Sequence, residues 1–315
     1  MGAKAEKTKK RKWAIIGLAF LFAACGWLFL NRKESTRKLA TFHKRHPISF
    51  LHIYGYLKWM PVYLRPIKYV LEHPKYFPRW LYNRAGNRLM QTHHSKVITI
   101  DTAKQLIDIK EPIRVSNPEN VLPFERARDI ILDNPNSIAV MDCSCRQISS
   151  NPCQPLDVCM VLGEPFVSFV VEHKKGRSRR VDVNEALEIL EREHKRGRVH
   201  TAWFKDAAGD RLYAICNCCS CCCLGIKGLK HGFEVVASSG YTAKVDNDTC
   251  TLCDTCRTAC QFEAIDILVD SIYVNEDKCK GCGVCAEVCP TNAISLHEDV
   301  KKPSPLFTHS SLTLN

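Results

Sequence analysis

The chain has 315 residues, enough for one large or two ordinary domains, and 45% of them are hydrophobic, so a mainly disordered protein is excluded. Its 19 cysteines are too sparse for a short secreted disulfide scaffold and too many for ordinary cytosolic usage, which favours thiolate-bound metal. The formal net charge of +12 would suit an anionic partner. Most of the excess of Lys and Arg lies in residues 1–45, beside the one strongly apolar run, so we expect the partner to be anionic lipid and not nucleic acid.

An apolar run without charges occupies residues 13–30 and follows a basic N-terminus, residues 1–12. The run is just long enough to span a bilayer, and a tryptophan near each end suits the two interfaces. The alternatives are a cleaved signal peptide, for which no small-residue cleavage site follows, and a lipoprotein site at Cys25. We therefore expect an N-terminal transmembrane anchor.

Residues 31–95 combine aromatic side chains with Lys and Arg and contain several prolines. Because proline interrupts helices, this juxtamembrane segment is expected to form short amphipathic helices that lie on the membrane or on a partner. The prolines are Pro47, Pro61, Pro66, Pro74 and Pro78.

A mixed α/β domain rich in cysteine is predicted for residues 96–235. Strands are expected at 97–100, 137–146, 199–204 and 210–218, and helices at 123–135 and 182–197. Asp182 and Glu185 have the spacing of a capping box, and Gly197 is a plausible end for that helix.

The last organised block, residues 236–298, contains an internal repeat, in which residues 248–267 align with residues 277–296 at an offset of 29. Each copy has the spacing C-x2-C-x2-C-x3-C. This spacing lets three thiolates wrap one face of a cubane while the fourth serves the other cluster. Two zinc sites or disulfides are the alternatives. The tail, residues 299–315, has no periodicity and is expected to be flexible.

This block resembles the bacterial ferredoxin domain with two [4Fe-4S] clusters. The resemblance implies a pseudo-twofold fold, with small sheets formed by the segments AKVD and SIYVN, and two ligand sets. It assigns the first cluster to Cys250, Cys253, Cys256 and Cys289, and the second to Cys279, Cys282, Cys285 and Cys260. Gln261 departs from the family pattern, which has proline there, as Pro290 does in the second copy.

Ten further cysteines precede the block, six of them in the stretch CNCCSCCC: Cys143, Cys145, Cys153, Cys159, Cys216, Cys218, Cys219, Cys221, Cys222 and Cys223. Neighbouring cysteines on a strand point to opposite faces, so the stretch is expected to contain a turn. Residues 117–224 resemble poorly characterised ferredoxin-like proteins of anaerobes. We favour a third iron–sulfur cluster here; zinc or copper, redox-active thiols activated by Arg146 and Lys227, and structural disulfides are the alternatives.

Together, these patterns predict an α+β protein with an N-terminal transmembrane helix, a mixed α/β cysteine-rich domain and a C-terminal pseudo-twofold ferredoxin-like domain. The expected function is membrane-anchored electron transfer between a redox donor and a redox acceptor. The alternatives are an iron–sulfur reductase whose upstream domain binds a substrate, and a thiol-based metal or redox sensor. Because cubane clusters are normally built in the cytosol, we expect a single-pass protein of the cell membrane with its clusters on the cytoplasmic side.

Overall fold

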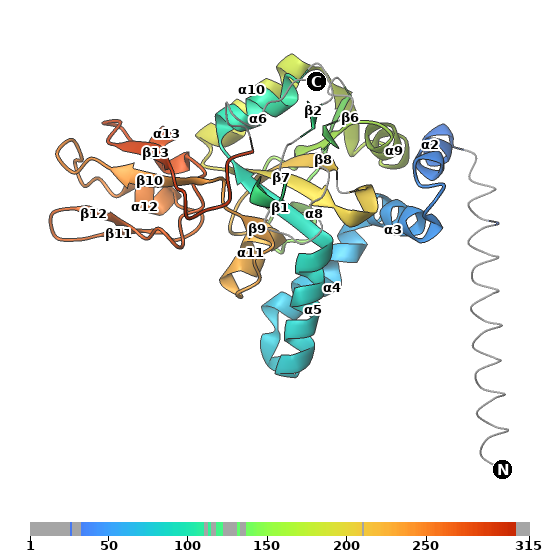
Figure 1. The fold of residues 1–315 in the computed structure, drawn as a ribbon, viewed down its shortest axis with the longest axis horizontal. Coiled ribbons are helices and arrows are strands. Elements are labelled where there is room, and N and C mark those ends of the chain that lie inside the picture. The colour runs from blue at the N-terminus through green and yellow to red at the C-terminus, as the bar shows by residue number, and fades with distance from the viewer. Residues whose placement is uncertain are drawn as a thin grey trace, which may run out of the picture.

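A seven-stranded sheet forms the centre of the molecule, with the strand order β6-β4-β5-β8-β7-β1-β9 (Figure 1). The computed structural model describes residues 33–109, 113–114, 118–121, 131–132, 137–209 and 211–306, together with Gly26. Neighbouring strands of the sheet are antiparallel except β1 and β9, which are parallel. The strands are β1 (His93–Ile98), β4 (Ile138–Asp142), β5 (Asp157–Leu162), β6 (Ser178–Val181), β7 (Val199–Lys205), β8 (Leu212–Cys218) and β9 (Val236–Ala237).

Helices cover both faces of this sheet, so the mixed α/β architecture expected for the cysteine-rich part is confirmed. One face packs against α6 and α10 through a core that includes Ile107 and Leu190. The other face packs against α2, α3 and α9 through Leu39, Ile53 and Val167. The helices outside the C-terminal block are α2 (Glu34–Phe42), α3 (Pro47–Lys58), α4 (Met60–Glu72), α5 (Arg79–Thr92), α6 (Ile100–Ile107), α7 (Pro118–Val121), α8 (Ser144–Gln147), α9 (Phe166–His173), α10 (Val183–Lys195) and α11 (Leu224–Lys230). Short 3-10 turns η1 (Pro74–Tyr76) and η2 (Asp206–Ala208) and a two-stranded sheet of β2 (Ile113–Arg114) and β3 (Ile131–Leu132) complete this part.

The predicted transmembrane helix is contradicted. Within the described ranges, no helix is both long enough and apolar enough to cross a membrane. The longest described helix, α5, has 14 residues, which corresponds to about 21 Å and is shorter than the apolar core of a bilayer. This finding also contradicts the predicted single-pass placement in the cell membrane, on which the expected side of the clusters depended. The predicted span, residues 13–30, lies outside the described residues apart from Gly26.

The basic and aromatic segment forms short helices, as predicted, although Pro66 lies inside α4 without ending it. Pro47 opens α3 and Pro61 lies in the first turn of α4, where a missing backbone N–H costs nothing. Part of this segment packs against the sheet, however, since α3 buries Ile53, Tyr54 and Leu57. The sequence pattern did not predict this packing because the apolar residues of α3 surround the helix rather than forming one stripe.

Most of the regular elements expected in the cysteine-rich part are present. Helix α10 begins after Asp182, whose side chain accepts a hydrogen bond from the Glu185 backbone N–H at 2.8 Å, and ends before Gly197, which has φ +73°. Strands β7 and β8 match two of the expected strands. The strand expected at 137–146 is correct only in its first half, because β4 ends at Asp142 and α8 follows. The strand expected at 97–100 is shifted, because β1 ends at Ile98 and α6 begins at Ile100. The expected helix at 123–135 lies almost entirely outside the described residues, and the two described residues in it form β3.

The C-terminal block extends from one end of the sheet, at the left of Figure 1. Strand β10 (Tyr241–Val245) pairs with β13 (Ile294–Glu298), and β11 (Ile265–Ile267) pairs with β12 (Ile272–Val274), both antiparallel. Two short helices, α12 (Thr255–Ala259) and α13 (Val284–Glu287), lie at the same 29-residue offset as the sequence repeat. The described part of the tail is packed, because Leu306 is buried in the core beneath α6 and α10.

Candidate metal centres

The two copies in the C-terminal block have the same backbone geometry. Left-handed residues recur at the offset of 29, with Asp254 matching Gly283 and Glu263 matching Asn292. One N–H···S hydrogen bond also recurs in each copy. The Ala264 backbone N–H donates to Cys260 Sγ at 3.4 Å, and the Ala293 backbone N–H donates to Cys289 Sγ at 3.3 Å. Backbone donors directed at thiolate sulfurs are a means by which proteins stabilise and tune iron–sulfur clusters.

Six of the eight cysteines of the block share one core, while Cys253 is exposed and Cys282 borders the neighbouring apolar cluster. Cys289 interacts electrostatically with Cys253 of the other copy, and Cys260 interacts with Cys282 and Cys285. The fourth cysteine of each copy therefore lies near the first three of the other copy. Burial raises the pKa of Cys282 to about 12, so the thiolate form of this side chain depends on a positive partner such as iron.

The chain passes close to itself at the second copy. Gly281 has φ +64°, and a Cβ atom there would lie 2.2 Å from the Tyr241 carbonyl oxygen. Glycine is therefore required where the cysteine loop passes strand β10. The donor set and this tight loop fit a cluster of the kind that the spacing predicts.

The ten upstream cysteines separate into two sets. We call the first set the six-thiol ring: Cys143, Cys145, Cys159, Cys216, Cys218 and Cys223. We call the second set the four-thiol group: Cys153, Cys219, Cys221 and Cys222. The predicted turn is present at residues 220–222, directly after β8 ends. It separates members of the two sets that are neighbours in sequence.

Each thiol of the six-thiol ring lies close enough to two others to shift or share in their pKa changes, so the interactions close on themselves. Their order around the ring is Cys143, Cys145, Cys223, Cys218, Cys216, Cys159 and back to Cys143. Hydrogen bonds from Cys145 and Cys159 hold the pKa of Cys143 well below the usual range of a thiol. Those from Cys145 and Cys218 do the same for Cys223. The neighbouring thiols and burial raise the pKa of the other four, Cys145, Cys159, Cys216 and Cys218. The ring alone thus favours negative charge on two of its sulfurs, and thiolates on the others would need positive charge nearby, such as metal ions.

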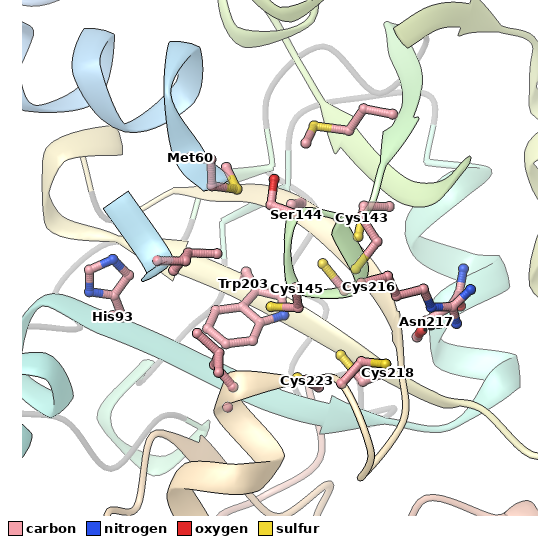
Figure 2. Close-up of a pocket in the computed structure, with 18 of the residues that line it drawn as sticks. Met60, His93, Cys143, Ser144, Cys145, Trp203, Cys216, Asn217, Cys218 and Cys223 are labelled. Atoms are coloured by element: carbon pink, nitrogen blue, oxygen red, sulfur yellow. Dashed lines mark hydrogen bonds between the residues drawn. The ribbon is translucent and has the colours of Figure 1, made fainter. Parts of the chain in front are cut away.

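These cysteines come from separate elements that the fold holds in place. Cys143 precedes helix α8 and Cys145 lies within it, while Cys159 lies on β5. Cys216 and Cys218 alternate with Asn217 on β8, so both face the same side of the sheet. In Figure 2 the labelled cysteine side chains converge on one region beside Trp203.

A cavity of about 100 Å³ lies against the six-thiol ring, and all six cysteines line it. This volume has room for about three water molecules. Most of the remaining wall is apolar or aromatic, with Trp203, Met60 and Tyr213 among the lining residues. Two buried polar atoms of lining residues, Ser144 Oγ and Arg146 Nε, have no hydrogen-bond partner among the described residues. Because buried donors without partners are costly, an occupant with acceptor atoms would suit this cavity.

The Arg146 guanidinium is fully buried beside the ring. It pairs with Glu193 at 3.1 Å and donates to the Asn217 carbonyl oxygen at 3.1 Å and to the Pro155 carbonyl oxygen. One cation that already has a carboxylate partner cannot balance several buried thiolates. Metal ions would supply the missing positive charge.

An apolar cluster and side-chain hydrogen bonds are among the contacts that join the C-terminal block to this region. Val284, between two cysteines of the second copy, is 1% exposed and packs in the same apolar cluster as Cys218 and Cys223. Gln261, next to Cys260, accepts a hydrogen bond from the Ser220 backbone N–H at 2.8 Å and donates one to the Gly197 carbonyl oxygen at 3.1 Å. The residue that departs from the family pattern therefore connects the block to the turn after β8, which proline could not do.

In a comparison with protein-family models, residues 272–295 match the 4Fe-4S binding domain. A search of curated proteins found no match. The matched segment contains Cys279, Cys282, Cys285 and Cys289, so the C-terminal block is an iron–sulfur binding domain that resembles ferredoxins. The resemblance of residues 117–224 to ferredoxin-like proteins of anaerobes finds no support in these comparisons.

Sequence patterns missed a buried polar network behind the ring. His200 lies between His194 and Asn217, at 3.2 Å and 2.7 Å, and the Asn217 side chain donates to the Val158 carbonyl oxygen at 2.8 Å. Burial lowers the pKa of His200 to about 3, so its ring is neutral. The only signal in the sequence was the placement of Asn217 between two cysteines, which could not identify its partners.

Proposed function

We propose that this protein is an iron–sulfur electron-transfer protein with three centres. Two [4Fe-4S] clusters occupy the C-terminal block, one held by Cys250, Cys253, Cys256 and Cys289 and the other by Cys279, Cys282, Cys285 and Cys260. The third centre is an iron–sulfur cluster held by the six-thiol ring. When bound, such clusters accept and release single electrons, and the protein controls their potential through burial and hydrogen bonds to sulfur.

The observation that carries this proposal is the shared apolar cluster at the junction. Val284 packs with Cys218 and Cys223 of the ring, and Cys282 borders the same cluster. The second cluster of the block would thus lie next to the upstream thiols, with no water layer between them. Such an arrangement suits conduction of electrons between the C-terminal block and the cavity.

Several features favour an iron–sulfur cluster over a single zinc ion in the ring. A structural zinc ion takes four ligands that surround one point, whereas the ring has six thiols around a cavity. Buried donors on Ser144 and Arg146 would find acceptors in inorganic sulfide. The C-terminal block also commits the protein to iron–sulfur chemistry and to a compartment in which thiols stay reduced.

Iron and sulfide counting on anaerobically purified protein tests the proposal. We expect more than about eight irons per chain, since two cubanes account for about eight. Cys159→Ser and Cys216→Ser should reduce the count to about eight and leave the signals of the C-terminal clusters in electron paramagnetic resonance (EPR) spectra. Cys25→Ser, outside both sets, is the matched control. An iron content of eight or less in the wild type, or unchanged iron in both ring variants, would refute the third centre.

Magnetic coupling tests whether the second C-terminal cluster and the third centre lie next to each other. In the fully reduced protein we expect the EPR signal of the second C-terminal cluster to be broadened by a neighbouring paramagnet. The Cys159→Ser variant should narrow this signal. If the signal is the same with and without the ring cysteine, the two centres do not lie next to each other and electrons do not pass between them by this route.

A further inference from the structure

We propose that the four-thiol group binds one zinc-class metal ion as a tetrahedral site, separate from the iron–sulfur centres. The ligands are Cys153, Cys219, Cys221 and Cys222, and each contributes one sulfur. The upstream cysteines would then serve two centres of different chemistry rather than one.

Distances between the sulfur atoms distinguish this group from a cubane site. All four Sγ atoms lie within 4.8 Å of one another, with 3.0 Å between Cys153 and Cys221 and 3.8 Å between Cys221 and Cys222. A tetrahedron with Zn–S bonds of about 2.3 Å has edges of about 3.8 Å. The sulfurs that bind a cubane lie farther apart, because each binds a different iron.

The rest of the chain provides an internal comparison. Among the described residues, no other set of three or more His, Cys, Asp or Glu side chains has all its ligand atoms within 4.8 Å. The eight cysteines of the C-terminal block, which match a cubane spacing, do not meet this limit, and neither do those of the six-thiol ring. Among the sets of cysteines, only the four-thiol group thus has its sulfur atoms close enough together, within the described residues, to bind one metal ion.

Access and charge also suit a metal ion. Cys221 is exposed and Cys153 is half-buried, whereas Cys219 and Cys222 are buried, so an ion could enter from solvent and be enclosed on the inner side. Four thiolates on one divalent ion leave two negative charges. Arg198 lies close enough to Cys153, and Arg146 to Cys219, for electrostatic interaction.

The ion would crosslink two loops that are far apart in sequence. Cys153 lies in the loop between α8 and β5, and the other three ligands lie in the turn after β8. Cys219 and Cys222 also line the cavity beside the six-thiol ring. Ser220, within the turn, donates its backbone N–H to Gln261 of the C-terminal block. The ion would therefore stabilise both the cavity wall and the junction between the two parts of the protein.

X-ray absorption at the zinc edge of the purified full-length protein tests this site without interference from iron. We expect about one zinc per chain, with four sulfur neighbours at about 2.3 Å. Cys221→Ser and Cys153→Ser should lose at least half of the zinc or replace one sulfur neighbour with oxygen, while iron, sulfide and the EPR signals stay at wild-type values. Cys25→Ser should change neither metal.

Four results in the wild-type protein would each overturn the proposal. The first two are zinc below about one tenth per chain after growth with added zinc, and zinc with mainly nitrogen or oxygen neighbours. The other two are copper in place of zinc, and a Cys153–Cys221 disulfide found by mass spectrometry in anaerobic protein. A fall of about four irons in the variants would also overturn it, because the group would then hold a cluster. A colourless, iron-free protein with an intact zinc–sulfur site would instead refute the electron-transfer proposal alone.

Discussion

Replacing Gln261 should weaken the junction between the C-terminal block and the rest of the protein. The side chain makes two hydrogen bonds across the junction, to the Ser220 backbone N–H and to the Gly197 carbonyl oxygen. Each is worth about 0.5–1.5 kcal/mol net, so Gln261→Ala should destabilise the protein by about 1–3 kcal/mol. The variant Gln261→Pro introduces proline, the residue that follows the fourth cysteine of the second copy as Pro290. Its free energy of unfolding should exceed that of Gln261→Ala by about 0.4–1 kcal/mol, because proline restricts the unfolded chain.

Thermal unfolding under anaerobic conditions measures this difference. At about 2–4 °C per kcal/mol, Gln261→Ala should lower Tm by several degrees, and Gln261→Pro by less. Both variants should keep the iron of the C-terminal block, since the family has proline beside this cysteine. Thr258→Ser, on the exposed side of α12, is a control that should leave Tm unchanged. A Tm within about 1 °C of wild type for Gln261→Ala would show that these two bonds do not hold the junction together.

Further predictions concern the interface, the cluster loop, one helix cap and acid stability. Val284→Asp places an unpaired carboxylate at a site that is 1% exposed, so it should cost about 3–5 kcal/mol and expose the junction to limited proteolysis. Gly281→Ala would bring its Cβ 2.2 Å from the Tyr241 carbonyl oxygen, and iron analysis should show about four irons fewer per chain. Asp182→Ala removes the side-chain acceptor at the start of α10 and should lower the free energy of unfolding by about 0.5–2 kcal/mol in urea titrations. Burial lowers the pKa of His200 from 6.5 to about 3, so the unfolded chain binds more protons between these values. Stability should therefore fall as pH drops below about 6.5, by up to about 1.4 kcal/mol per unit, and urea titrations of His200→Gln between pH 5 and 7 should show a shallower slope.

Sequence patterns predicted the elements whose signals are local. The capping of α10 by Asp182 follows from side-chain chemistry over four residues. The strand segments AKVD and SIYVN of the C-terminal block came from the resemblance to ferredoxins, and they overlap β10 and β12. The separation of the upstream cysteines into two sets could not be predicted, because it depends on which strands become neighbours. Cys159 reaches Cys143 and Cys216 only because β5 lies between β4 and β8 in the sheet. Spacing along the chain contains no information on that order.

The same reasoning explains how one stretch of eight residues can serve two centres. While the chain is extended, the residue period of two directs Cys216 and Cys218 toward the cavity and directs Asn217 toward the buried histidines behind it. Once β8 ends, the turn directs Cys219 away from the ring, and Cys223 returns to the ring at the start of α11. A strand throughout this stretch would mix the two sets on each face, and a helix would bring residues three and four apart together instead. The position at which β8 ends therefore determines which thiols can share a metal, and the two proposed centres both depend on it.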